Sequence, residues 1–146
     1  MSDTDAQFIR ALIKRNRYLS LATCDGERPW IAPLEYISDE DLNLYFFSPE
    51  DADHCEQLAE RCQVAVAIFD GVQPEYEPSP EMPIAGLQIA AEARKLIEPF
   101  PKLVDAQIEA WKLPMPPYAP FIIQPIRWFV PVLKDGANCR REVKVR

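Results

Sequence analysis

The stretch from Leu42 to Asp70 constrains the fold more than any other part of the sequence. In residues 42–47, Leu and Phe alternate with their neighbours at the period of two that is typical of a half-buried strand. Ser48-Pro49 interrupts this alternation, and residues 64–69 return to β-branched and aromatic side chains. The stretch therefore predicts a strand, a turn, a short helix and a second strand.

The short helix is predicted from apolar residues that follow the turn at helical spacing. Cys55, Leu58 and Cys62 would share one face of this helix. Asp51 or Asp53 is the expected N-cap, because a carboxylate there accepts hydrogen bonds from the first backbone N–H groups. We therefore expect an amphipathic helix that begins near one of these two aspartates.

The rest of the chain predicts many short strands and a few helices. Strands are expected over residues 18–24, 29–37, 84–96, 119–124 and 126–133, and helices over residues 5–17 and 101–112. Asp25-Gly26 is a strong hairpin signal, so the first three strands should form a meander. Pro125 and Pro131 predict bends or edges in the closing strands. This pattern indicates a closed or nearly closed antiparallel barrel with peripheral helices.

Two segments have the pattern of neither a strand nor a helix. Residues 71–83 are acidic and contain four prolines, so they predict a loop, either a variable surface loop or a lid over a site. Residues 134–146 are highly charged and predict a solvated C-terminal tail.

Composition excludes several classes of function. The 146 residues, 48% of them hydrophobic, suit a single domain over 1–146. A net charge of -7 argues against nucleic-acid binding and against an anionic membrane surface. No apolar run approaches the roughly 20 residues of a membrane-spanning helix. The N-terminus has no signal-peptide pattern, so we expect a cytoplasmic protein in which the four cysteines are free thiols.

The turn and the short helix carry a resemblance to a known family. Phe47-Ser48 ends a strand, His54 follows at the family's position for Lys or His, and Leu58 lies on the next helix. In this respect the chain resembles the pyridoxamine-phosphate-oxidase-like, FMN-binding split barrels over about residues 18–133. The resemblance implies a mainly β fold, an antiparallel split β-barrel with peripheral α-helices. Ala52 and Asp53 depart from the family pattern, which usually has Ser and often Arg there.

Within this family the chain is most similar to the uncharacterised YhbP-like branch. That branch has a Gly-Val-Gln strand after a variable loop, and a basic pair near the C-terminus. Gly86-Leu87-Gln88 and Arg140-Arg141 occupy the matching places in this chain.

The resemblance implies an FMN-binding homodimer with the cofactor at the interface, which acts as an oxidoreductase on an unidentified small molecule. We expect no catalytic side chain, because the flavin performs the redox chemistry while the protein orients it. The cofactor-binding residues carried over from the family are Ala32, Pro33, Leu34, Glu35, Phe47, Ser48, His54 and Gln88.

Several of these residues also have a simple structural interpretation. Ser48 is a common turn or helix-cap residue. His54 is the only histidine, and nothing in the local sequence fixes a partner for it. Phe47 is equally suited to a hydrophobic core. Gln88 alternates with apolar neighbours, which is the pattern of a solvent-facing strand residue.

The acidic turn weakens the expected phosphate site. Glu50, Asp51 and Asp53 would repel a phosphate dianion, although solvent screening softens the effect. The missing positive charge is expected from Arg140 or Arg141 of a partner chain, unless these arginines belong to a solvated tail.

Three alternatives to an FMN enzyme follow from the same residues. The first is a non-catalytic binding or scaffold protein that keeps the barrel without the phosphate site. The second is binding of haem or a deazaflavin, with His54 as a haem ligand. The third is a zinc site made of His54, Cys55, Cys62 and Cys139, but their spacing matches no zinc motif, so we expect no metal.

Overall fold

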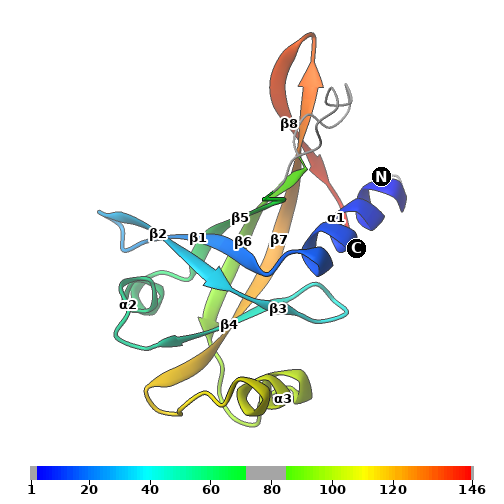
Figure 1. The fold of residues 1–146 in the computed structure, drawn as a ribbon. Helices are drawn as coiled ribbons and strands as arrows, with labels where there is room; N and C mark the ends of the chain where they lie inside the picture. Colours follow the sequence, from blue (N-terminus) through cyan, green and yellow to red (C-terminus); the bar gives the residue numbers. More distant parts are fainter. Residues whose placement is uncertain (1–2, 72–84, 146) are drawn as a thin grey trace.

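The computed structural model describes residues 3–71 and 85–145 (Figure 1). All of the loop predicted over residues 71–83 except Gly71 lies outside this part. The helices are α1 (Asp3–Arg15), α2 (Asp53–Glu60) and α3 (Lys102–Trp111). The strands are β1 (Tyr18–Cys24), β2 (Pro29–Glu35), β3 (Ile37–Ser38), β4 (Leu44–Pro49), β5 (Gln63–Phe69), β6 (Gly86–Lys95), β7 (Tyr118–Lys134) and β8 (Ala137–Val143).

The strands form one antiparallel sheet in the order β2-β1-β5-β6-β7-β4-β3, and β8 pairs with β7. The two ends of this order, β2 and β3, are consecutive in the chain and are separated only by Tyr36. The sheet therefore curls back on itself, and the barrel stays split where β2 and β4 are not hydrogen-bonded (Figure 1). The predicted split barrel is confirmed. The predicted meander is confirmed only in part: β2 pairs with β1, but the strand predicted over residues 29–37 breaks at Tyr36, and the separate short strand β3, not β2, pairs with β4.

The barrel interior is filled by the side chains that point inward, at every second position along the strands. Phe46 is fully buried and stacks on Phe121, with ring centroids 4.9 Å apart. Helix α1 covers one end of the barrel with a stripe of Ile9, Leu12 and Ile13, each no more than 1% exposed. Among the described residues, no helix has the length and hydropathy that a membrane span requires.

Helix α2 begins differently from our prediction. Neither Asp51 nor Asp53 is the N-cap; the cap residue is Ala52, which provides no side-chain hydrogen bond. Asp53 is already in the first turn, where a carboxylate interacts favourably with the helix dipole. Cys62 is also outside the helix, because Arg61 is extended and leads directly into β5. Cys62 is therefore exposed rather than part of the buried face.

The two predicted closing strands are one continuous strand, β7, which bends at Pro125. Ala91 pairs with Pro125 and Ala90 pairs with Arg127, so Ile126 is an extra residue in a β-bulge. Proline has no backbone N–H for the ladder, and the bulge accommodates it without breaking the strand. Ala90 and Ala91 of β6 lie opposite this bulge.

The C-terminal tail predicted over residues 134–146 is wrong for most of its length. Ala137–Val143 forms β8, which pairs with β7 through a tight turn at Asp135 and Gly136. Both turn residues have positive φ, 52° and 76°, as a two-residue hairpin turn requires. We call residues 131–141 the β7–β8 arm. Figure 1 shows that this arm projects well beyond the barrel.

Candidate functional site

The four predicted residues of β2 do not share one face. Pro33 and Glu35 lie on the outer side of the barrel, where Pro33 is opposite Ser20 of β1. Ala32 is buried on the inner side, and Leu34 is half-buried against the core. Because strand side chains alternate between faces, a single ligand cannot contact all four side chains.

Ser48 and His54 are brought together inside the barrel. The Ser48 Oγ lies 3.0 Å from the His54 Nε2, and the two residues are only 4% and 8% exposed. Their pairing fastens the end of β4 to the first turn of α2. The centroid of the imidazole ring lies 5.8 Å from that of Phe46. Both residues therefore face the core rather than an open site.

Burial controls the titration of this pair. Desolvation lowers the pKa of His54 from its ordinary value, and the charge of Asp53 opposes this effect. Desolvation also raises the pKa of the neighbouring Cys55 thiol, a hydrogen bond with Ser48 lowers it, and the charges of Glu50 and Asp51 raise it further. The imidazole and the thiol are therefore held in their neutral forms.

Phe47 lies in a third place, under helix α3. Its ring meets that of Trp111 edge to face, with centroids 5.7 Å apart. It packs against the small cluster of Tyr45, Val104 and Ile122 that fixes α3 to the barrel. This position corresponds to the structural interpretation of Phe47.

Gln88 lies on the outer face of the sheet, in a region paved with small side chains. Strand pairing places Ser20, Ala67, Gln88 and Phe129 in one row across four strands. The next row contains Ala22, Ala65 and Ala90. These residues leave a shallow apolar depression of about 210 Å³, which Ile31 and Arg140 border.

A larger cleft of about 720 Å³ adjoins this depression at the base of the β7–β8 arm. Its walls include Phe69, Leu87 and Pro131, and its polar groups belong to Gln88, Asn138, Cys139 and Arg140. Gln88 and Arg140 line both hollows, so we call the two together the outer-face groove. Its volume is within the roughly 300–1,000 Å³ of typical ligand clefts.

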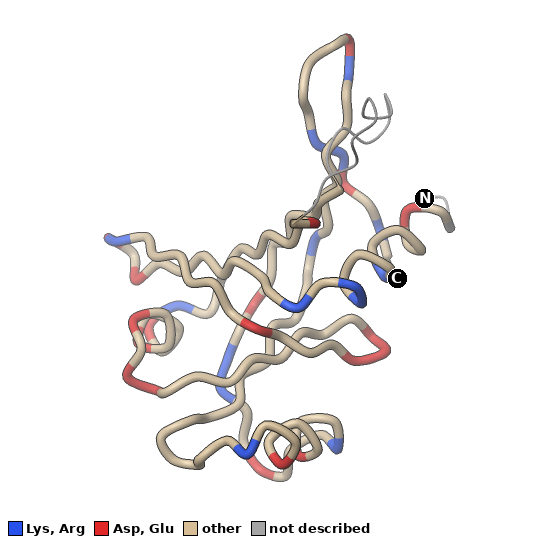
Figure 2. The backbone as a smooth tube through the Cα atoms, in the orientation of Figure 1, with Lys and Arg blue, Asp and Glu red and all other residues tan. Residues whose placement is uncertain are grey.

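The two arginines of the arm have different surroundings. The Arg140 guanidinium lies over the Phe129 ring, 4.3 Å from the centroid, at the edge of the groove. Arg141 instead points to α1, where it donates a hydrogen bond to Asp5 at 2.9 Å. Figure 2 shows Lys and Arg along the arm and at its base. Arg140 is therefore the arginine of this pair that is positioned to meet a ligand in the groove.

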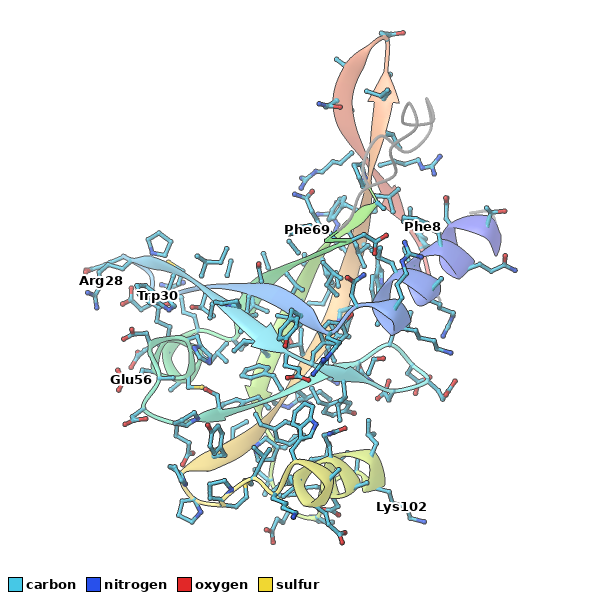
Figure 3. The ribbon with its side chains drawn as sticks, in the orientation of Figure 1. Phe8, Arg28, Trp30, Glu56, Phe69 and Lys102 are labelled. Carbon is cyan, nitrogen blue, oxygen red and sulfur yellow. The ribbon has the colours of Figure 1, made fainter. Side chains whose placement is uncertain are left out.

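A second cleft, of about 520 Å³, separates α2 from the β1–β2 hairpin. Figure 3 shows Arg28, Trp30 and Glu56 around it. Its carboxylates are Asp25, Asp53, Glu56 and Glu60, and Arg28 is its one cationic residue among those the structure describes. A phosphate dianion does not fit this charge distribution, because one cation faces four carboxylates.

Gln57 forms the buried floor of this acidic cleft. Its amide oxygen accepts a hydrogen bond from the Thr23 hydroxyl at 2.6 Å, and its amide nitrogen donates to the Arg28 carbonyl at 3.1 Å. We did not anticipate this residue from the sequence. The sequence indicated Gln57 through its place between Cys55 and Leu58, where a polar side chain lies on the helix face that packs against the barrel.

The donors present suit a flavin in the outer-face groove better than in the acidic cleft. The groove offers apolar walls for a ring, amides for its polar edge and one arginine for an anionic end. The residues of the zinc alternative are not assembled: no group of three His, Cys, Asp or Glu residues could hold a metal ion in residues 3–71 and 85–145.

Comparisons with known proteins agree with this fold. A protein related to general stress protein 26 of B. subtilis (pyridoxinephosphate oxidase family), from Clostridium acetobutylicum, superposes with a TM-score of 0.69 at 12% identity, covering 98% of this chain and 97% of that one. A FAD-binding protein from Mesorhizobium loti gives a TM-score of 0.61 at 15% identity, covering 99% of this chain and 96% of that one. The haem storage protein HutZ from Vibrio cholerae gives a TM-score of 0.62 at 18% identity, covering 84% of this chain and 91% of that one.

At these identities the superpositions show a shared fold. No curated protein matches the sequence at a significant level. The family model described as pyridoxamine 5'-phosphate oxidase, however, matches residues 6–129, which is most of the chain. The chain therefore belongs to the pyridoxamine 5'-phosphate oxidase family.

Proposed function

We propose that this protein binds FMN between two copies of the chain and acts as a flavin-dependent oxidoreductase on a small molecule. The observation that carries the proposal is the outer-face groove, where Gln88 and Arg140 border an apolar hollow. Membership of the family supports a flavin as the ligand. The similar fold of a protein named as FAD-binding is in keeping with it.

Exposed apolar residues support a second copy on this face. Tyr18, Ile31 and Phe69 are 58%, 65% and 59% exposed, and all three lie on the outer side of the sheet. Such a set of large apolar side chains, around a floor of alanines, is typical of an interaction surface. The β7–β8 arm projects beyond the barrel, so in such a pair it would reach over the partner (Figure 1).

Each part of the groove has a role in this proposal. The small side chains of β1, β5 and β6 give a flat apolar floor for the flavin ring. The Gln88 amide offers both a donor and an acceptor to the polar edge of the ring. Arg140, at the edge of the same groove, supplies the positive charge that the acidic turn lacks. A bound flavin supplies the redox chemistry, while these residues bind and orient it.

Visible absorbance of the purified protein tests the proposal. The protein is measured as isolated, and again after incubation with excess FMN and removal of the free ligand. The proposal predicts a retained flavin spectrum at about one equivalent per chain, and a dimer by analytical ultracentrifugation. A dimer that retains no flavin would reject the cofactor, and a monomer that retains flavin would reject the shared site.

A second candidate function is a non-catalytic binding protein that has kept the barrel. The specific observation in its favour is the region around α2, where Ser48 and His54 are hydrogen-bonded to each other and the neighbouring cleft is acidic. Failure to retain flavin in the absorbance experiment would favour this candidate. His54 does not face the outer-face groove, so it offers no haem ligand there.

A further inference from the structure

His54 and the acidic turn before it are not used by the proposed function. His54 is the only histidine of the chain, and it is held inside the barrel by the Ser48 hydroxyl. Only one residue separates it from Ala52, the N-cap of α2, so its position determines how the first turn of the helix sits on β4. A neutral imidazole suits this site, because it makes one hydrogen bond and packs on an aromatic ring.

The groups that face His54 stabilise its neutral form at the buried site but not its charged form. From β4, it meets the uncharged side chains of Ser48 and Phe46. From α2, it meets the charge of Asp53 and has the neutral Cys55 thiol beside it in the chain. An imidazolium would lose its hydration at the present site without gaining a buried counter-charge.

The acidic turn offers a counter-charge immediately outside this site. Asp51 and Asp53 are exposed, and Glu50 is ion-paired with Lys95 of β6. Of the three acids in this turn, the two aspartates therefore remain to receive a charged imidazole. A rotation of the His54 side chain toward them would break its contact with Ser48 and release the start of α2.

We propose that His54 is a pH-operated latch: neutral, it fastens α2 to β4 through Ser48, and protonated, it moves to the acidic turn and loosens α2. This device does not depend on the proposed flavin site. Helix α2 carries one wall of the acidic cleft, including Asp53, Glu56 and Gln57, so acidification would change the shape of that cleft.

The sign of the effect follows from the surroundings of the imidazole. Burial lowers the pKa of His54 below its ordinary 6.5, so the latched form disfavours the proton. The stabilisation by the latch is therefore complete above pH 6.5 and declines as the pH falls below that value. Loosening should increase by up to about tenfold for each further pH unit.

Two measurements on the whole protein test this proposal. The first is hydrogen exchange of the α2 amides between pH 7.5 and 5, expressed as protection relative to the intrinsic rate at each pH. We expect protection to fall in the native chain and to be independent of pH in His54→Gln, which keeps a hydrogen-bonding side chain without the charge. The same fall in both proteins would overturn the proposal.

The second measurement is an NMR titration of the single histidine, which needs no variant and covers the case in which His54→Gln does not fold. We expect a pKa below 6.5 and, in Asp51→Asn/Asp53→Asn, a further decrease, because the charged form loses its destination. A His54 that titrates at or above 6.5 in the native chain would overturn the proposal. So would a titration that leaves the α2 amide signals unmoved.

Discussion

The Thr23 hydroxyl donates a 2.6 Å hydrogen bond to the amide oxygen of Gln57, and both side chains are buried. This bond joins β1 to α2, and the amide nitrogen of Gln57 continues it to the Arg28 carbonyl of the hairpin turn. Two contacts therefore hold helix α2 on the barrel. Gln57 binds the hairpin, and His54 binds β4.

Thr23→Val should lower the free energy of unfolding by about 1–3 kcal/mol, because it leaves the buried Gln57 oxygen without its donor at almost unchanged volume. Thr4→Val is the matched control, since Thr4 is exposed on α1, and it should change stability by less than about 0.5 kcal/mol. Urea denaturation measures both. Equal effects of the two substitutions would mean that the bond contributes nothing specific.

Phe46→Ala should be among the most damaging substitutions. Phe46 is fully buried and stacked on Phe121, so removing its ring leaves a cavity that costs about 3–5 kcal/mol. Ile97→Ala is the control, because Ile97 is 85% exposed and its loss should be nearly neutral. A thermal or urea unfolding curve checks the pair, and a Phe46→Ala protein of native stability would contradict the described core.

Asp70 should contribute an acid-dependent part of the stability. It accepts hydrogen bonds from Arg15 and Asn16, and the contact with Arg15 lowers the pKa of its carboxyl below the ordinary 3.8. The contribution is therefore present above pH 3.8 and is lost as the pH falls through the lowered value. Unfolding free energies measured from pH 6 to pH 2 should fall less steeply at the acid end in Asp70→Asn than in the native chain. Identical slopes would refute this role.

Ala67→Glu should separate the proposed two copies. Ala67 lies in the centre of the outer face, where the longer Glu side chain would fill the apolar floor and bring a charge into the dimer interface. Ala106→Glu is the matched control on the exposed side of α3. Sedimentation velocity should show a monomer only for Ala67→Glu. A dimer that survives this substitution would exclude the outer face as the interface.

The sequence was most informative where local chemistry sets the structure. The Asp25-Gly26 turn and the alternation around Leu44 and Phe46 gave β1 to the residue and the ends of β2 and β4 to within two residues, although β4 continues through Ser48-Pro49, where we expected it to break. The β8 strand was missed although Asp135-Gly136 is the same hairpin signal. The high charge of the flanking residues outweighed it in our interpretation, because an exposed strand in a projecting arm buries little apolar surface.

The site was harder to predict than the fold because it depends on which face each side chain takes. The alternation of β2 separates Ala32 from Pro33, and the curl of the barrel turns Ser48 and His54 inward. The outer-face groove combines residues from strands far apart in the sequence, such as Gln88 and Arg140. The alternation of residue types along one strand does not show which residues of other strands lie beside it. The register of strand pairing determines that.

The affinity for FMN of Arg140→Ala, compared with that of Arg141→Ala, tests the central claim most directly. Arg140 borders the outer-face groove, whereas Arg141 is engaged with Asp5, so the two variants remove the same charge from different places. We predict that Arg140→Ala weakens FMN binding by about tenfold or more and that Arg141→Ala leaves it nearly unchanged. Equal affinities in both variants and the native chain would contradict the proposed site.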